Sequence, residues 1–319
     1  MWFNEFVSLG LDLVFCGTPQ FAVPTLERLA GSGFNIRLVL TQPDRPKGRG
    51  MELVASPVKM SAARLGLPVY QPEKIKQNEE LRAKLEQIAP AAIIVVGYGR
   101  IIPSWMLQLP RLGNLNLHAS LLPKYRGAAP IQWAVANGER VTGVTTMRID
   151  EGLDTGDILL QRELPVFEED TSETLAPKLA AVGAELMVET LQGLQSGNIT
   201  PHAQDNNLAT LAPILKKEDG RIDFQRTAEE VFNRLRGFQP WPGAFTTFRG
   251  KMLNITAAKP CGEKIGAGQL LTRASQLFVG CGSNTALELF ELQPEGKKRM
   301  AARDFIHGYH PQAGEMLGG

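Results

Sequence analysis

Short apolar runs alternate with segments of helical period through the first 195 residues, and this alternation constrains the fold more than any other feature. The apolar runs predict strands at Leu11–Cys16, Ile36–Leu40, Val69–Tyr70, Ala91–Val96, Leu115–Leu117, Val144–Ile149 and Leu159–Leu164. The segments between them predict helices at Pro57–Leu65, Glu79–Ile88 and Ser172–Gln195. Because strands that alternate with helices form βαβ units, we expect an α/β domain with a mostly parallel sheet.

The turn after the first predicted strand also predicts the start of a helix. Thr18 has the side chain of an N-cap, and Pro19 suits the first helical position because its missing N–H needs no partner there. Gly31 and Gly33 are expected to end this helix.

The composition changes after residue 195. Residues 196–208 are polar and contain glycine, proline and asparagine, which is typical of a linker. The remaining residues predict one helix at Ala228–Arg236, followed by short strands at Ala244–Phe248, Leu253–Ala257, Gly268–Leu271, Leu277–Val279 and Ala286–Leu292. Short strands separated by turns favour a small β barrel or sandwich. We therefore expect a first domain over residues 1–195, a linker over 196–208 and a second domain over 209–319.

Composition excludes several classes of protein. A hydrophobic share of 43% and a charged share of 21% are those of a soluble globular chain, not of a disordered or fibrous one. The three cysteines, Cys16, Cys261 and Cys281, contain no C-x-x-C pair, which argues against a disulfide framework or a zinc ribbon and favours the cytoplasm. The apolar run at Ala89–Gly97 is far shorter than the ~20 residues of a membrane span. Met1–Gly10 lacks the basic residues of a signal peptide.

The net charge of +1 hides an uneven distribution. From residue 206 onward, 15 Lys and Arg stand against 11 Asp and Glu, which gives the second domain a net charge of +4. Such a balance suits contact with a phosphate backbone, and it is also common on domains that bind no nucleic acid. If the domain binds RNA, we expect Lys297, Lys298 and Arg299 to contact phosphates.

Asn116 and His118 stand two residues apart near the carboxyl end of a predicted strand. Their side chains therefore point to the same face, while Leu115 and Leu117 fill the other. An amide and an imidazole side by side can hold a carbonyl oxygen and move protons near neutral pH. The alternative is a buried histidine whose ring is bonded to a backbone carbonyl.

The segment Asp150–Asp157 contains four carboxylates and two glycines, which predicts a loop. A carboxylate of this loop, placed beside His118, would orient its ring. The alternative is an ordinary acidic turn. The spacing is not that of an EF-hand.

The segment Gln42–Gly50 follows the second predicted strand at the edge of the sheet where ligands bind. Its prolines are expected to prevent helix formation and strand pairing, and its glycines to loosen the backbone, so we expect a long mobile loop. Arg45, Lys47 and Arg49 would contact phosphates. The alternative is a solvated surface loop.

At these residues the chain resembles the folate-dependent formyltransferases. The resemblance rests on motifs that extend from Leu11 to about His307, chiefly Cys16–Pro19, Thr41–Pro46, Gly48–Gly50, Ser56–Lys59, Asn116–Trp133, Asp150–Asp157 and Gly237–Ala244. It implies a Rossmann-like formyltransferase domain followed by an OB-type β barrel. It also implies transfer of a formyl group from 10-formyltetrahydrofolate to the α-amino group of methionine on initiator tRNA, with no metal.

The resemblance further implies which residues act. Asn116, His118 and Asp154 match the family's catalytic residues. The residues expected to bind the folate are Ser120, Leu121, Leu122 and Pro123, together with Tyr98, Gly99, Arg100 and Ile101 around the pterin. The loop Gln42–Gly50 matches the one that approaches the tRNA acceptor stem, although Met51 and Glu52 stand where many relatives have two basic residues.

Two other functions remain as alternatives. One is a formyltransferase of the same family that acts on a small amine, such as glycinamide ribonucleotide or an amino-sugar nucleotide. The other is a non-catalytic RNA-binding protein. The loop Gln42–Gly50 and the segment around Trp241 favour tRNA over the small amines, and the intact catalytic residues argue against a non-catalytic role. We expect a cytoplasmic monomer without a membrane partner.

Overall fold

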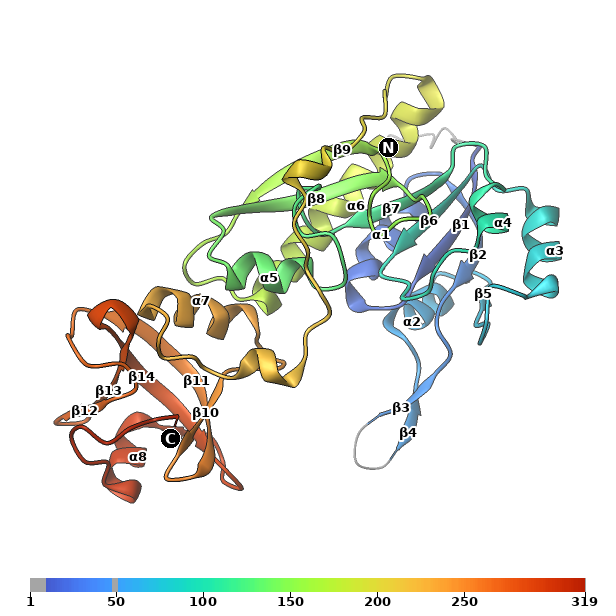
Figure 1. The fold of residues 1–319 in the computed structure, drawn as a ribbon. Helices are drawn as coiled ribbons and strands as arrows, with labels where there is room; N and C mark the ends of the chain where they lie inside the picture. Colours follow the sequence, from blue (N-terminus) through green and yellow to red (C-terminus); the bar gives the residue numbers. More distant parts are fainter. Residues whose placement is uncertain (1–9, 48–50, 319) are drawn as a thin grey trace, which may run out of the picture. The chain divides into compact units, whose positions relative to one another are not determined.

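The computed structural model describes residues 10–47 and 51–318, which form two compact units (Figure 1). Unit 1 consists of Met1–Gly127, Val141–Pro165 and Ala176–Leu211. Unit 2 consists of Ala128–Arg140, Val166–Leu175 and Ala212–Gly319. Each unit is thus assembled from three separate stretches of the sequence.

A seven-stranded sheet forms the centre of unit 1, in the order β5-β2-β1-β6-β7-β8-β9. Its strands are β1 (Asp12–Gly17), β2 (Asn35–Leu40), β5 (Val69–Tyr70), β6 (Ala92–Val96), β7 (Asn114–His118), β8 (Val141–Arg148) and β9 (Ile158–Pro165). The first five strands in that order are parallel, whereas β8 pairs antiparallel with both β7 and β9. The mostly parallel sheet is therefore confirmed. All five residues of β6 are buried, as a parallel strand covered on both faces requires.

Helices pack on both faces of this sheet. They are α1 (Val23–Ala30), α2 (Pro57–Arg64), α3 (Glu79–Ile88), α4 (Ser104–Leu107) and α6 (Ser172–Ser196). On one face, Val14 shares a buried cluster with Leu81 of α3 and Met106 of α4. On the other, α6 approaches β7 closely because Gly183 has no side chain: a Cβ there would lie 2.6 Å from the side chain of Leu117.

The first helix starts later than the sequence predicted. A single 3-10 turn, η1 (Gln20–Ala22), follows β1, and α1 begins only at Val23. Thr18 does not cap a helix. Its hydroxyl donates to the carbonyl of Tyr98 at 3.2 Å and accepts from the backbone N–H of Gln42 at 3.4 Å. The hydroxyl is thus bonded to the segments that follow β6 and β2, which replaces its expected bond to helical N–H groups.

The segment after β2 forms a two-stranded antiparallel ribbon that projects from unit 1 (Figure 1). Strand β3 (Arg45–Lys47) pairs with β4 (Glu52–Val54), and Pro46 lies opposite Leu53. The expectation that proline would prevent pairing is therefore wrong. Both strands of an isolated ribbon are edge strands, where a missing N–H is tolerated. Gly48–Gly50 lie outside the described residues, and the expected mobility of this segment stays a prediction.

An antiparallel sheet forms the centre of unit 2, in the order β10-β11-β14-β13-β12, with β15 beside β14. Its strands are β10 (Phe245–Phe248), β11 (Lys251–Cys261), β12 (Leu270–Arg273), β13 (Gln276–Cys281), β14 (Thr285–Pro294) and β15 (Met300–Ala301). Two later residues connect its edges: Leu317 bridges Phe248 of β10, and Met316 bridges Gln269 beside β12. The sheet is closed into a small barrel in this way, which confirms the predicted β domain.

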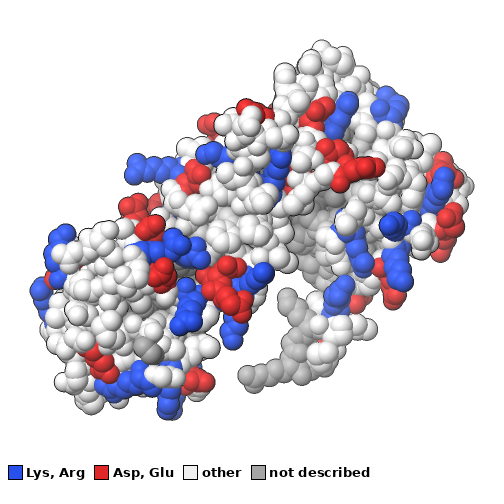
Figure 2. All heavy atoms as spheres, in the orientation of Figure 1, with Lys and Arg blue, Asp and Glu red and all other residues white. Residues whose placement is uncertain are grey.

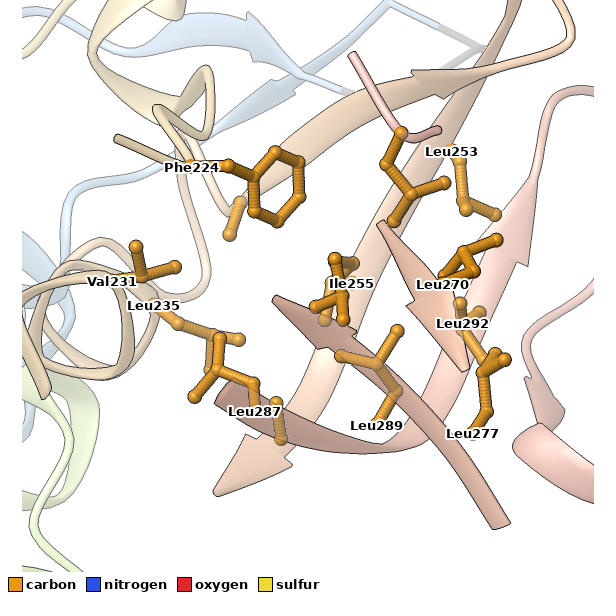
Figure 3. Packing of buried hydrophobic residues seen from close by; sticks show 14 of the residues in the cluster. Phe224, Val231, Leu235, Leu253, Ile255, Leu270, Leu277, Leu287, Leu289 and Leu292 are labelled. Carbon is orange, nitrogen blue, oxygen red and sulfur yellow. The ribbon is translucent and has the colours of Figure 1, made fainter. Parts of the chain in front are cut away.

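Leucines from four strands fill the barrel (Figure 3). The labelled members of this cluster are Phe224, Val231, Leu235, Leu253, Ile255, Leu270, Leu277, Leu287, Leu289 and Leu292. Unit 2 also contains the helices α5 (Pro130–Ala136), α7 (Ala228–Gly237) and α8 (Ala302–Tyr309) and the turns η3 (Lys217–Gly220) and η4 (Gly282–Asn284). Helices α5 and α7 touch at Gly237, where a Cβ would lie 2.6 Å from the backbone nitrogen of Ala136. Beside this contact, the rings of Trp133 and Phe238 meet edge to face at 5.2 Å.

Within residues 10–47 and 51–318, no helix is long and apolar enough to cross a bilayer.

Candidate active site

Strand β7 presents Asn116 and His118 on the face of the sheet opposite α6. Leu117 lies between them in the sequence and packs toward Gly183 of α6, so the two polar side chains share the other face. His118 is 5% exposed, whereas Asn116 is half-buried. No described residue hydrogen-bonds to the side-chain amide of Asn116, which leaves it available to a ligand.

The imidazole ring of His118 has a defined partner on each side. Nε2 lies 2.9 Å from the carbonyl oxygen of Tyr125, and because a carbonyl can only accept, Nε2 carries a proton. Nδ1 lies 3.7 Å from Oδ2 of Asp154. That distance is too long for a direct hydrogen bond, so a proton on Nδ1 is open to a substrate atom. The backbone carbonyl of the structural alternative and the expected loop carboxylate therefore both lie beside the ring.

Two carboxylates of the loop after β8 have different partners. Asp150 builds the loop, because its side chain accepts hydrogen bonds from the hydroxyl of Thr155 at 2.8 Å and the N–H of Gly152 at 3.0 Å. Asp154 faces His118 instead, and its Oδ2 accepts the backbone N–H of Gly127 at 2.9 Å. Asp154 also has a positive φ of 52°, which is uncommon for a residue other than glycine.

The segment expected to bind the folate is fixed by two polar residues that sequence reasoning missed. The hydroxyl of Thr145, on β8, donates to the carbonyl of Ser120 at 2.7 Å and accepts the N–H of Leu122 at 3.1 Å. Gln161, on β9, donates to the carbonyl of Leu122 at 2.9 Å. The side chains of Ser120 and Leu122 are buried, so a ligand would contact the half-buried Leu121 and Pro123. The sequence signal that could have found Thr145 and Gln161 is a polar residue at a position of a predicted strand that points into the protein.

The second segment expected at the folate, Tyr98–Ile101, follows β6. The ring of Tyr98 lies in the core at 1% exposure, where burial raises the pKa of its hydroxyl, so its side chain faces away from solvent. Its carbonyl accepts the amide of Gln42 at 3.0 Å. Gly99 has a φ of +73°, and a Cβ there would lie 2.7 Å from that amide. Arg100 is half-buried, and Ile101 is 90% exposed, which is unusual for an aliphatic side chain.

The residues expected to bind tRNA are placed on both units. At the base of the β3–β4 ribbon, the guanidinium of Arg45 donates to Oε1 of Gln42 at 3.4 Å. Lys59 pairs with Asp44 at 2.6 Å, and this hydrogen bond holds the pKa of the carboxyl below its usual range. Arg49 and the side chain of Lys47 lie outside the described residues.

On unit 2, Lys297, Lys298 and Arg299 are exposed in the turn between β14 and β15. Arg299 lies 3.8 Å from the carboxylate of Glu291. On the face that Figure 2 draws, Lys and Arg mix with Asp and Glu on both units. The net positive charge of residues 206–319 is therefore not gathered into one patch on that face.

No group of three or more His, Cys, Asp and Glu that could hold a metal occurs in the described part of the chain.

Comparisons with known proteins bear on the family of the chain. Residues 12–191 match the formyl transferase family, and residues 214–310 match the formyl transferase C-terminal domain. A methionyl-tRNA formyltransferase of Koribacter versatilis is 66% identical over 96% of this chain and 98% of its own length. One of Solibacter usitatus is 52% identical over 97% and 99%.

Two solved structures share the fold at lower identity. An N-formyltransferase of Helicobacter canadensis, in complex with folinic acid and dTDP-3-aminofucose, has a TM-score of 0.66 at 20% identity and covers 89% of this chain and 99% of its own. HypX of Aquifex aeolicus, in complex with tetrahydrofolic acid, has a TM-score of 0.58 at 17% identity, over 96% of this chain and 48% of its own.

Proposed function

Because the chain belongs to the formyl transferase family, we propose that it transfers a formyl group from 10-formyltetrahydrofolate to the α-amino group of methionine on initiator tRNA. Relatives that are 52% to 66% identical over almost their whole length carry the name methionyl-tRNA formyltransferase, which supports this acceptor. The observation that carries the chemistry is the ring of His118, which lies between the carbonyl of Tyr125 and the carboxylate of Asp154.

The reaction begins when the neutral amine attacks the formyl carbon. Attack converts the carbonyl into a tetrahedral oxyanion, which Asn116 and the Nδ1 proton of protonated His118 stabilise as preorganised donors. Asp154 balances the charge of the imidazolium. It also helps to pass the proton lost by the amine to N10 of the folate as the bond between carbon and N10 breaks. The products are formylmethionyl-tRNA and tetrahydrofolate.

The folate lies at the carboxyl edge of the parallel sheet in this proposal. Ser120–Pro123, which follow β7, offer backbone groups and the side chains of Leu121 and Pro123. Tyr98–Ile101, which follow β6, offer backbone, the Arg100 guanidinium and the exposed Ile101. Because β6 and β7 are parallel neighbours in the sheet, the segments that follow them start at the same edge.

The tRNA is held by basic residues of both units in this proposal. Arg45 and Lys47 of β3, and Arg49 of the sequence that follows it, contact the acceptor stem, and Lys297, Lys298 and Arg299 contact phosphates. Residues 1–195 carry the catalytic residues, 209–319 carry the second tRNA contact, and 196–208 connect the two stretches in the sequence. The protein acts as a cytoplasmic monomer.

Transfer of a radiolabelled formyl group tests the proposal directly. We expect label in acid-precipitable initiator tRNA charged with methionine, and much less with uncharged tRNA, glycinamide ribonucleotide or a dTDP-amino sugar. Label on either small acceptor at a higher kcat/KM than on the charged tRNA would replace this function by the small-amine alternative. Binding of tRNA without any transfer would favour the non-catalytic alternative.

A further inference from the structure

The side chain of Gln204, in the segment expected to be only a linker, is bonded to the backbone of the Asp154 loop. Its Nε2 donates to the carbonyl of Asp154 at 2.9 Å and to that of Gly156 at 2.7 Å. Its Oε1 accepts Nε and Nη2 of Arg126 at 3.0 and 2.8 Å. Because a guanidinium can only donate, the orientation of the Gln204 amide is determined, and all of its polar atoms are used.

The segment that carries Gln204 is bonded to the rest of unit 1 on both sides of this residue. His202 exchanges two backbone hydrogen bonds with Ile158, at the start of β9. Further along, Arg126 donates its backbone N–H to the carbonyl of Thr210 at 2.9 Å. Asn206, in the 3-10 turn η2 (Asn206–Leu208), accepts a third bond from the Arg126 guanidinium at 2.9 Å. We call Arg126, Gln204 and Asn206 the Gln204 brace.

The brace closes a ring of bonds around the proposed catalytic pair. Three consecutive residues form one side of this ring. The carbonyl of Tyr125 accepts from His118, the guanidinium of Arg126 donates to Gln204, and the N–H of Gly127 donates to the carboxylate of Asp154. Gln204 completes the ring through the carbonyl of Asp154. The carboxylate and the carbonyl of Asp154 are thus both held relative to the residues that fix His118.

The backbone of Asp154 needs such support. A positive φ is strained for a residue with a side chain, and it persists only where the surroundings enforce it. Arg126 is 7% exposed, and its bonds in the brace are to two neutral amide oxygens. Its charge is therefore not neutralised by the groups that it holds, which points to a geometric role.

We infer that Gln204 is a positioning residue for formyl transfer, which rests on the proposed function of His118 and Asp154. Through the Asp154 and Gly156 carbonyls it sets the distance between the carboxylate and Nδ1 of His118. The variant Gln204→Glu tests the positioning of Asp154 while it keeps the contact between residue 204 and Arg126. The substituted carboxylate still accepts from Arg126, as an ion pair, but it loses both donors to the loop.

The test measures steady-state transfer to charged initiator tRNA with both substrates varied. We expect Gln204→Glu to lower kcat about 10- to 100-fold, with both KM values within about 3-fold, because a small displacement of a catalytic group affects the chemical step. Its Tm should stay within about 4 °C of the wild type. Asn207→Ala is the matched control, because Asp205 of the same turn is the one partner of the Asn207 side chain among the described residues, and its kcat should be unchanged.

A double-mutant cycle shows whether Gln204 acts through Asp154. In an Asp154→Asn background, Gln204→Glu should lower kcat by less than about 3-fold, since there is no carboxylate left to position. Equal losses in both backgrounds, a loss confined to KM, or no loss at all would each overturn the inference.

Arg126→Lys is a second test, because it keeps the charge but loses the two parallel hydrogen bonds to Gln204. Its effect on kcat should likewise be much smaller in the Asp154→Asn background. If neither variant folded, the brace would be structural and the inference wrong. The proposed chemistry is tested separately: if Asp154→Asn and His118→Ala alone left kcat unchanged, the roles of His118 and Asp154 would fail before Gln204 was considered.

Discussion

Replacing Gly237 by alanine tests the contact between α5 and α7 through the sign of its effect. At an open helical position, glycine to alanine stabilises by up to ~1 kcal/mol. At position 237 a Cβ would lie 2.6 Å from the nitrogen of Ala136, 2.8 Å from the carbonyl oxygen of Gln132 and 2.9 Å from Cα of Ala136. All three atoms belong to the backbone of α5, so no side chain can move aside and the helices must separate.

Overpacking of this kind costs about 1–3 kcal/mol, and separation also weakens the contact between Trp133 and Phe238. We expect Gly237→Ala to lower the free energy of unfolding of unit 2 by about 2 kcal/mol, and its Tm by roughly 5–8 °C. Thermal unfolding followed by tryptophan fluorescence and by calorimetry measures both.

Gly308→Ala is the matched control. Gly308 also lies in the last turn of a helix, α8, but a Cβ there meets nothing within 4 Å. We expect it to raise Tm by about 2–4 °C. If Gly237→Ala were as stabilising as Gly308→Ala, the close approach of α5 and α7 would not exist in the protein.

Three further outcomes are expected. His118→Ala should lower kcat by at least ~100-fold while folate binding is kept, because it removes a donor to the transition state; a variant within ~3-fold of wild type would exclude His118 from the mechanism. If the six basic residues of the ribbon and of unit 2 meet phosphates, log K for tRNA should fall with log salt at a slope of about −4 to −5, and Arg45→Ala should reduce that slope by about 1; a flat plot would reject electrostatic binding. Removing residues 314–319 should destabilise unit 2, because they connect both edges of the barrel; an unchanged Tm in calorimetry would show that the barrel does not need this closure.

Much of the fold could be predicted because it follows from local patterns. Most strands of both units overlap the short apolar runs, although β3, β4 and β15 were not predicted. Helix α6 was expected within one residue of its end at Ser196. Asn116 and His118 could be placed on one face of the sheet because alternate residues of a strand point to the same side. The loop Asp150–Asp157 was recognised by its composition.

The features that were missed depend on partners far away in the sequence. Thr18 has the side chain of a helix cap, but its partner is Tyr98, 80 residues away. Gln204 lies in a polar segment that reads as a linker, and its partners are 50 and 78 residues distant. The pairing of Pro46 was missed because a proline rule for central strands was applied to an isolated ribbon. Local periodicity carries no information about such bonds.

The assignment of α5 to unit 2 decides where the chain can be divided for expression. A fragment that starts at residue 209 contains the whole barrel and α7, but it leaves Ala129, Trp133 and Ala136 behind. Phe238 and Leu215, which are buried against those residues, would then face water. A recombinant C-terminal fragment would therefore carry an apolar surface that the intact chain covers, and a soluble version would need residues 128–140 supplied as a peptide or joined by a redesigned connection.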